Sequence, residues 1–321
     1  MTRVDLITGF LGSGKTTFIK KYALYLAGKK KKICILENDY GAINVDMMLL
    51  SELENKGVDL EMVAGGCDYD CHRRRFKTKL ITMAMLGYDR VIIEPSGIFD
   101  VDEFFDILHE EPLDRLYEIG NVITIIKADL EDDFSDEADF MLASQTVNAG
   151  CVLLSRTQEV EKNRIEATVR HLNNALKKVK SKRKMTIGTA EVISKNWDDL
   201  ADEDYETIEN SGYKSESFEK KFSMDDSSFD AFFFMNLDMD YDKIKDAIKD
   251  LFEDKTIGSV MRVKGFAKSK DKWLEINATK KGINENEISK GQNIIIVIGE
   301  NLDKGKIDTF FNARFSTVKT K

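Results

Sequence analysis

The feature that most constrains this chain is a short glycine-rich loop between a predicted strand and a predicted helix. Residues 9–16 read GFLGSGKT; they follow the apolar run RVDLIT at 3–8 and overlap the start of the helical stretch KTTFIKKYALYLAG at 15–28. The spacing fits the pattern G-x-x-x-x-G-K-S/T, in which backbone N–H groups surround a phosphate at the start of a helix. The loop therefore predicts a phosphate site at the carboxyl end of a buried strand.

Each residue of the loop has a predicted task. The glycines let backbone amides curl around a β-phosphate, Lys15 reaches the β- and γ-oxygens, and Thr16 supplies a hydroxyl to Mg²⁺. A glycine-rich turn without a ligand is the alternative, and it would leave a lysine and several amides directed at nothing. The residues predicted to bind the nucleotide here are Gly9, Gly12, Ser13, Gly14, Lys15, Thr16 and Thr17.

Further strands with the same character recur through the first two hundred residues. They are short, β-branched and apolar without alternation, which is typical of strands buried on both faces. Helix-length segments such as RIEATVRHLNNALKKV at 164–179 lie between them. The predicted strands are 3–8, 32–37, 90–94, 121–126, 151–154 and 184–188. This alternation predicts an α/β fold of the P-loop NTPase class, with a mostly parallel sheet covered by helices.

The length of 321 residues exceeds what one hydrophobic core usually serves, so we expect two domains. Residues 1–195 form the predicted nucleotide-binding domain. The acidic segment 196–215 has no sustained apolar period and is predicted to be a linker or a peripheral excursion. Residues 216–321 form a small α+β domain, with a helix at 241–254, a hairpin over 259–282 and an apolar central strand near 295.

Composition excludes several classes of protein. The chain has 48 Lys and Arg against 57 Asp and Glu, so its net charge of −9 repels nucleic acid. No apolar run reaches the length of a membrane span, and the N-terminus enters a strand pattern directly, so we expect a cytoplasmic protein without a membrane partner.

Among its four cysteines, Cys34 and Cys151 lie in apolar strands and are predicted to be core residues.

Two further strand ends carry acidic residues. In RVIIEPSG, Glu94 closes a buried strand and is predicted to hold Mg²⁺ together with Thr16, while Gly97 lets the backbone approach the γ-phosphate. Glu94 could instead cap a turn. In ILENDYG, Glu37 and Asp39 stand at the same carboxyl edge and are candidates for a segment that responds to the nucleotide.

Taken in order, GFLGSGKTT, ENDYG, GGC and EPSG resemble the motifs of the CobW-type metallochaperones, P-loop GTPases of the class that includes urease and hydrogenase maturation factors. RVKGF, KWLEI and IIIVIGENLD are similar to the small C-terminal domain of that family. The resemblance covers nearly the whole chain. It implies a GTPase whose cycle loads, holds or delivers a transition metal, zinc or cobalt, to a client metalloprotein, and it is compatible with a homodimer. Slow turnover is expected, since the sequence offers no assignable catalytic arginine or water-positioning glutamine.

The resemblance also places a metal site. In the family a C-x-C-C cluster follows a glycine at this point, whereas this chain reads GGCDYDCHRRR from residue 65. Cys67 matches the first cysteine, and Cys71 with His72 completes a C-x₃-C-H set. Thiolate, imidazole and carboxylate suit zinc. Two incidental loop thiols and a redox dithiol are the alternatives.

The base pocket departs from the family pattern N-K-x-D, because the strand CVLL is followed by SRTQ. These residues are Ser155, Arg156, Thr157 and Gln158. An aspartate accepts hydrogen bonds from both guanine N1–H and its amino group, whereas one glutamine amide matches adenine comparably well. Losing a charge-assisted bond costs about 1.5–3 kcal/mol, roughly ten- to a hundredfold in preference. These residues do not decide whether the base pocket selects GTP or ATP, whereas the resemblance favours GTP.

Two functions of other classes stay open at this point. A small-molecule kinase uses the same phosphate loop and needs an acceptor site. A metal-independent assembly switch binds nucleotide and a partner protein, and it does not need the cysteines. The run RRR at 73–75 favours a solvated helix face, but it could also stabilise a thiolate or contact a phosphate or an acidic partner.

Overall fold

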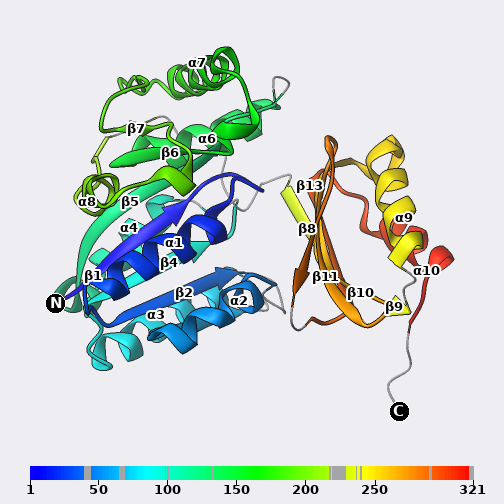
Figure 1. Cartoon of the computed structure of the whole chain (residues 1–321), viewed down its shortest axis with the longest axis horizontal. Helices are drawn as coiled ribbons and strands as arrows, with labels where there is room; N and C mark the ends of the chain where they lie inside the picture. Colours follow the sequence, from blue (N-terminus) through cyan, green and yellow to red (C-terminus); the bar gives the residue numbers. More distant parts are fainter. Residues whose placement is uncertain are drawn as a thin grey trace. The chain divides into compact units, whose positions relative to one another are not determined.

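The chain divides into two compact units, Met1–Met224 and Asp225–Lys321, which we describe separately (Figure 1). The computed structural model describes residues 1–39, 45–64, 69–97, 99, 101–131, 134–216, 218, 229–235, 237–238, 241–288 and 291–317.

The first unit is built on a seven-stranded sheet in the order β3-β2-β4-β1-β5-β6-β7. Every neighbouring pair is parallel, which confirms the predicted α/β class. The first strand, which leads into the glycine loop, lies in the middle of the sheet. The strands are β1 (Thr2–Thr8), β2 (Ile33–Asp39), β3 (Val58–Ala64), β4 (Arg90–Pro95), β5 (Tyr117–Lys127), β6 (Cys151–Ser155) and β7 (Val192–Ile193).

Helices cover both faces of this sheet (Figure 1). Because side chains alternate along a strand, Cys34 and Leu36 pack with one layer while Ile33 and Ile35 pack with the other. The first layer consists of α3 (Tyr69–Met85), α4 (Val101–His109), α5 (Leu113–Leu116), α6 (Asp136–Val147) and α7 (Lys162–Lys178). The second layer consists of α1 (Lys15–Gly28), α2 (Val45–Leu50), the 3-10 turns η1 (Ser51–Lys56) and η3 (Trp197–Asp199), and α8 (Asp202–Glu209).

Both cysteines predicted to be core residues are buried, which confirms that prediction. Cys34 and Cys151 are each 0% exposed, and burial raises the pKa of each thiol to about 12. Ser135 caps α6 by accepting a hydrogen bond from the Ala138 amide at 3.0 Å. None of the helices in the described part of the chain is both long and apolar enough to cross a bilayer.

One predicted strand of this sheet was wrong and one strand was missed. Residues 184–188 are not a strand, because the Asn173 amide bonds both backbone groups of Met185, at 2.8 and 2.9 Å, and so replaces a strand ladder. The last strand of the sheet is instead Val192–Ile193. The edge strand β3 was not predicted, since VDLEMVA alternates acidic and apolar residues and lacks the continuous apolar run of a central strand.

Residues 196–215 lie within the first unit. They include η3 and α8, and both pack on the sheet: Trp197 is 9% exposed and Ile208 is 0% exposed, within the same cluster as α1. At the end of α8, the Glu209 carboxylate accepts hydrogen bonds from Lys29 at 2.8 Å and Lys31 at 3.0 Å. Two lysines of the basic run at 29–32 therefore hold this segment in place.

Beneath α8 lies a buried polar network. The Arg90 side chain, 2% exposed, contacts Asp5 at 2.7 Å, the Tyr22 hydroxyl at 2.7 Å and Glu209 at 3.4 Å. The Asn121 amide nitrogen donates to the Glu209 backbone carbonyl at 3.0 Å, and the Asn121 backbone N–H donates to Asp5 at 2.9 Å. One cation thus joins β1, β4 and α8 and neutralises carboxylates that have little access to water.

The pKa of Glu209 reflects this setting. Burial opposes ionisation of the carboxyl group, but the hydrogen bonds from Lys29 and Lys31 outweigh it and lower the pKa from 4.5 to about 2. A carboxylate with a depressed folded-state pKa stabilises the fold fully above its unfolded pKa, and this contribution is lost as the pH falls. The contribution of Glu209 is therefore lost between about pH 4.5 and pH 2.

The second unit is a five-stranded antiparallel sheet in the order β12-β11-β10-β13-β8, with two helices packed on one face, as predicted for the C-terminal part. The polar edge strand β12, GINENEI, was not predicted. The elements are β8 (Phe229–Met235), α9 (Tyr241–Glu253), the 3-10 turn η5 (Lys255–Ile257), β10 (Ser259–Ser269), β11 (Lys272–Thr279), β12 (Gly282–Ile288), β13 (Ile294–Glu300) and α10 (Lys304–Arg314). A short pair joins β9 (Leu237–Asp238) to β14 (Ser316–Thr317).

Candidate nucleotide and metal site

The glycine loop between β1 and α1 depends on glycine at identifiable positions. Gly9 has a φ of 146°, and a Cβ there would lie 2.3 Å from the Ile125 carbonyl oxygen of the neighbouring strand. Gly12 and Gly14 also have positive φ, at 73° and 101°. These conformations favour glycine, and they bring the loop backbone close to β5.

The polar side chains of the loop fold back on it. Lys15 is 8% exposed, and its ammonium donates to the Gly9 carbonyl at 3.0 Å. Ser13 is 2% exposed, and its backbone amide bonds the Phe10 carbonyl at 3.2 Å, which closes the turn before the helix. Thr17 is exposed on the first turn of α1. The lysine head is thus held over the loop.

An acidic cluster lies at the start of α1. The Thr16 hydroxyl oxygen is 2.9 Å from an Asp46 carboxylate oxygen and 3.0 Å from a Glu94 carboxylate oxygen. Oxygens of Glu37, Asp46 and Glu94 all lie within 4.8 Å of one another. Glu37 and Glu94 are register partners on β2 and β4, so the sheet itself sets two of these carboxylates side by side.

This donor set determines which ion the cluster could hold. Three carboxylates at such separations repel one another, and Glu37 and Glu94 are only 2% and 4% exposed. Carboxylate and hydroxyl oxygens, without sulfur or imidazole, fit a hard divalent cation such as Mg²⁺ better than a soft transition metal. The residues therefore fit the magnesium that accompanies a nucleoside triphosphate.

Asp46 was missed in the sequence. It belongs to the first turn of α2, a short helix that follows residues 40–44, which lie outside the described part of the chain. The signal available was an acidic residue at a helix start soon after ENDYG. Asp39, predicted beside Glu37, is the last residue of β2.

Gly97 brings the end of β4 against the glycine loop. A Cβ at this position would lie 2.7 Å from a Leu11 methyl carbon and 3.2 Å from the Leu11 backbone nitrogen. The Gly97 carbonyl accepts a hydrogen bond from the buried Gln145 amide at 2.9 Å. A Cβ at this position would displace the Leu11 side chain and crowd the Leu11 backbone, so glycine allows this close approach.

The predicted soft-metal ligands lie at the start of α3. Cys67 is outside the described residues, so its pairing with Cys71 stays a prediction. Cys71 is partly exposed, whereas His72 is 1% exposed and its Nε2 lies 2.8 Å from the Asn38 side-chain oxygen. Successive helical residues point about 100° apart, so Cys71 and His72 do not face the same point. His72 as a third ligand also stays a prediction, and here it links α3 to the end of β2.

The predicted base loop follows β6. Ser155 is 1% exposed, and Arg156 has a left-handed φ of 57° and lies 4.0 Å from Glu159. Gln158 is exposed within the 3-10 turn η2 (Thr157–Glu159). Trp197, whose role was not predicted, lies near the loop glycine: its ring would be 3.4 Å from a Cβ placed on Gly14.

A glycine loop between the first strand and first helix of a parallel sheet, with carboxylates at adjacent strand ends, defines the class of P-loop nucleotide-binding proteins. Within this class, the chain belongs to the CobW/HypB/UreG family, because the model of that family's nucleotide-binding domain matches residues 3–187.

Individual relatives are similar over shorter stretches. The chain is 38% identical to the zinc chaperone YeiR of Escherichia coli (strain K12) over 112 residues, which cover 34% of this chain and 32% of YeiR. It is 28% identical to the zinc chaperone YjiA of the same strain over 165 residues, covering 48% and 49%. The chain thus spans about a third to a half of these curated relatives. The zinc-bound crystal structure of YjiA GTPase from E. coli aligns with 98% of both chains at 15% identity and a TM-score of 0.38.

Proposed function

We propose that this protein hydrolyses GTP slowly, with Mg²⁺, and couples its nucleotide state to the binding of zinc and its delivery to a client metalloprotein. Met1–Met224 would serve as the nucleotide-binding domain and Asp225–Lys321 as a C-terminal domain of CobW type. The family membership and the names of the two zinc chaperones support this proposal. Cobalt in place of zinc, ATP in place of GTP, and a homodimer are finer alternatives within it.

The single observation that carries the nucleotide part is the contact of Thr16 with Asp46 and Glu94, one residue beyond Lys15. It sets a hydroxyl and two carboxylates next to an ammonium at the start of a helix. Ammonium and helix amides bind phosphate, and hydroxyl with carboxylates bind a hard cation. The start of α1 therefore offers candidate partners for both the phosphate and the metal of a metal–triphosphate complex.

The roles of the side chains follow from this arrangement. Lys15 exchanges its bond to the Gly9 carbonyl for phosphate oxygens, and the loop amides bind the β-phosphate. Thr16, Asp46 and Glu94 would hold the Mg²⁺, which neutralises phosphate charge when bound. Slow turnover is expected, since the described residues around the loop do not include an assignable catalytic arginine or a glutamine that positions water.

A route for coupling runs through neighbouring residues. Glu37 belongs to the acidic cluster, and the next residue, Asn38, bonds His72 of α3. Cys71 precedes His72 on the helix. A shift of the β2 end when the γ-phosphate is lost would therefore move the start of α3 and with it the candidate zinc thiol.

The coupling predicts that zinc affinity depends on the bound nucleotide. We expect at least a tenfold difference in zinc affinity between protein loaded with a non-hydrolysable GTP analogue and protein loaded with GDP, about 1.4 kcal/mol of coupling. Competition with a chromophoric zinc chelator under anaerobic conditions measures it. The variant Cys67→Ser with Cys71→Ser should lose both the affinity and the difference, whereas Thr82→Ser, exposed on the same helix, should retain both.

Other outcomes of that experiment identify the rival functions. Equal zinc affinity in the two nucleotide states contradicts the coupling and favours a metal-independent switch. A double cysteine variant that keeps its zinc would place the zinc site at other residues. Transfer of the γ-phosphate to a small molecule instead of water would identify a kinase.

Gln158 provides a separate prediction on the base. Replacing it with aspartate restores the charged acceptor for guanine, so we expect Gln158→Asp to raise the preference for GTP over ATP about ten- to a hundredfold. Competition between the two nucleotides for a fluorescent analogue measures this preference. The neighbouring change Glu159→Gln, also exposed on η2, serves as the control and should leave the preference within about twofold. An unchanged ratio in Gln158→Asp would remove this loop from the base pocket.

A further inference from the structure

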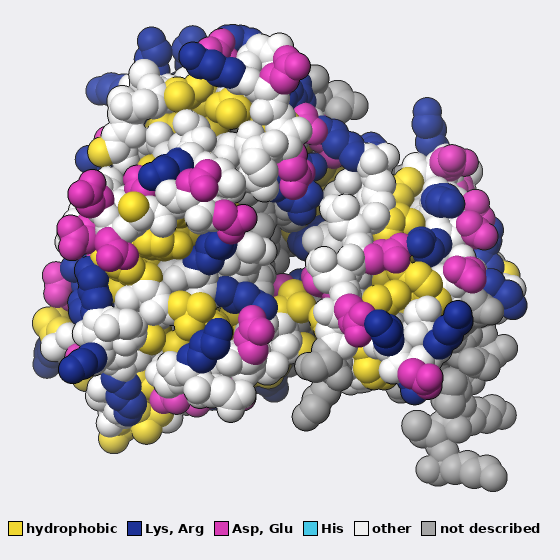
Figure 2. All heavy atoms as spheres, in the orientation of Figure 1, with side chains coloured by type: hydrophobic (Ala, Val, Ile, Leu, Met, Phe, Trp, Pro, Cys, Tyr) yellow, Lys and Arg dark blue, Asp and Glu magenta, His cyan; other side chains and the backbone are white. Residues whose placement is uncertain are grey.

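The outward face of α3 carries an unusual concentration of positive charge. The inward face of the helix is apolar apart from His72, with Phe76, Leu80 and Met83 at most 1% exposed. The outward face carries Arg73, Arg74, Arg75, Lys77 and Lys79. Over most of the surface in view acidic and basic side chains are interspersed (Figure 2), and the chain as a whole has a net charge of −9.

Nearby acids neutralise only part of this charge. The carboxylate of Glu110, which follows α4, forms ion pairs with Lys77 at 2.6 Å and Arg73 at 2.5 Å. The hydrogen bonds and positive charges of these two residues lower the pKa of Glu110. Glu61 of β3 forms an ion pair with Lys79 at 2.7 Å. Glu110 and Glu61 thus pair with Arg73, Lys77 and Lys79, and in the part of the chain that the structure describes neither of these carboxylates pairs with Arg74.

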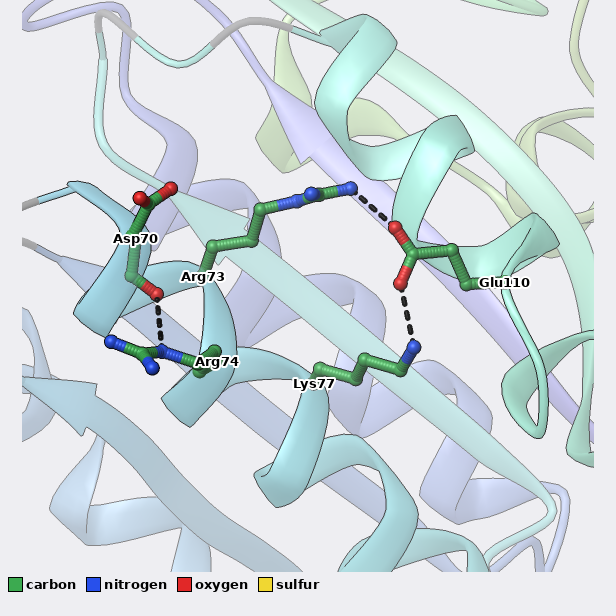
Figure 3. Close-up of a pocket in the computed structure, with 5 residues that line it drawn as sticks. All are labelled: Asp70, Arg73, Arg74, Lys77 and Glu110. Atoms are coloured by element: carbon green, nitrogen blue, oxygen red, sulfur yellow. Dashed lines mark hydrogen bonds and ion pairs between the residues drawn. The ribbon is translucent and has the colours of Figure 1, made fainter.

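Arg74 lies at the centre of this face. Its guanidinium bonds the Asp70 backbone carbonyl at 3.3 Å and the Cys71 sulfur at 3.5 Å. Within the described ranges, no carboxylate comes within ion-pair distance of it. Figure 3 shows Arg73 and Lys77 both reaching Glu110, while Arg74 extends to the other side of the helix. The guanidinium is exposed and keeps most of its donors for another molecule.

The surface around Arg74 is hollowed on both sides. One hollow of about 250 Å³ is lined by Asp70, Arg73, Arg74, Lys77 and Glu110. A second, of about 420 Å³, is lined by Arg74, Arg75, Thr78, Lys79 and Thr82. Arg74 lines both hollows and so lies between them, and we call this stretch of α3 with its two hollows the basic track. The helix then ends in Met85 and Leu86, which are 82% and 46% exposed.

We propose that this track is the docking surface for an acidic, carboxylate-rich segment of the client protein. The inference rests on the proposed function, because it takes the partner to be the acceptor of the metal. Carboxylates form paired hydrogen bonds with guanidinium groups, and exposed apolar residues at one end supply contact area. Since Arg74 touches the Cys71 sulfur, a segment bound along the track would lie next to the candidate zinc thiol.

The distribution of charge favours a protein partner over a nucleic acid. A nucleic acid strand presents evenly spaced phosphates, and Asp70, Glu61 and Glu110 interrupt the basic face and would repel some of them. An acidic peptide can place neutral or apolar residues opposite these carboxylates. Charge complementarity on a chain that is acidic overall also makes the site selective.

The test uses the full-length protein and a fluorescein-labelled twelve-residue peptide that alternates Asp, Glu and Gly. Fluorescence anisotropy at low ionic strength should detect binding that weakens as salt is raised. Charge reversal in Arg74→Glu with Arg75→Glu is expected to weaken binding at least tenfold. The control, Arg170→Glu with Lys177→Glu on the exposed face of α7, changes the net charge equally and should weaken it less than about twofold.

Each other outcome overturns the proposal. An equal loss in the α7 control would mean that only total charge matters, and equal binding of an Asn–Gln–Gly peptide would remove the carboxylate requirement. Tighter binding of single-stranded DNA or of anionic vesicles at the same ionic strength would assign the surface to another class of partner. Circular dichroism and thermal unfolding of both variants confirm that they fold.

Parallel measurements separate this proposal from the function on which it rests. The α3 reversal should leave GTP hydrolysis within about twofold of the wild-type rate. If the wild type shows no dependence of zinc affinity on nucleotide but the peptide still distinguishes the two variants, the proposed function fails and the docking surface stands. If zinc coupling is present and the peptide does not distinguish them, the surface alone fails.

Discussion

Replacing Lys15 with alanine is expected to lower kcat/KM for GTP hydrolysis at least 100-fold. Lys15 is the one cation in the glycine loop, and its ammonium already lies over the loop backbone, 3.0 Å from the Gly9 carbonyl. Removing a donor that is preorganised toward developing negative charge costs about 3 kcal/mol or more in the transition state. Release of inorganic phosphate, measured with saturating Mg²⁺ and purified protein, gives the rate.

A matched control lies on the same helix. Lys20 is a surface lysine of α1 whose ammonium pairs with Glu52 at 2.8 Å, an exposed ion pair of the kind that contributes less than about 1 kcal/mol. Lys20→Ala should therefore keep nearly the full rate. If Lys15→Ala retained more than about a tenth of the wild-type rate, hydrolysis would have to be assigned to another site or to a contaminating enzyme.

The strands that were predicted correctly are those that the fold covers on both faces. Central strands such as Ile33–Asp39 and Arg90–Pro95 are covered on both faces, so their residues form uninterrupted apolar runs. The edge strands β3 and β12 have one side free of strand partners and alternate polar with apolar residues, and both were missed. Residues 184–188 are apolar enough for a strand, but a single side chain, Asn173, removes their backbone groups from any ladder.

The candidate site was predictable where contiguous residues build it and not where separate segments meet. Lys15 and Thr16 belong to one loop motif, and Glu94 ends a strand that the sequence identifies. Asp46 reaches Thr16 across a separation of 30 residues, and no local pattern indicates that contact. Likewise, the Nε2 of His171 lies 2.6 Å from a carboxylate oxygen of Asp139, which is 32 residues away in the sequence.

Helical phase explains the difference at α3. The string CHRRR suggests neighbouring ligands, but consecutive residues of a helix diverge, so His72 turns inward to Asn38 while Cys71 stays at the surface. The angle between consecutive side chains on the helix also explains why Arg74 lies between two hollows while Arg73 points toward Glu110. The sequence shows which residues this segment contains. Which of them face the solvent follows from the packing of Phe76 and Leu80 against the sheet.

Replacing Arg90 with methionine is expected to lower the free energy of unfolding by about 3–5 kcal/mol. Methionine fills a similar volume, so the change removes a charge without leaving a large cavity. It leaves the Asp5 carboxylate, 0% exposed, without the buried cation that neutralises it, whereas Glu209 keeps its pairs with Lys29 and Lys31. Denaturant unfolding followed by circular dichroism measures the difference.

The cost in Arg90→Met should come from the uncompensated charge and not from lost packing. Adding Asp5→Asn to Arg90→Met removes that charge, so the double variant should be more stable than the sum of the two single changes by at least about 1 kcal/mol. Arg170→Met, at an exposed position of α7, should change stability by less than about 0.5 kcal/mol. A cost below about 1 kcal/mol for Arg90→Met, or strict additivity with Asp5→Asn, would mean that water or another group compensates Asp5 and that Arg90 does not hold α8 to the sheet.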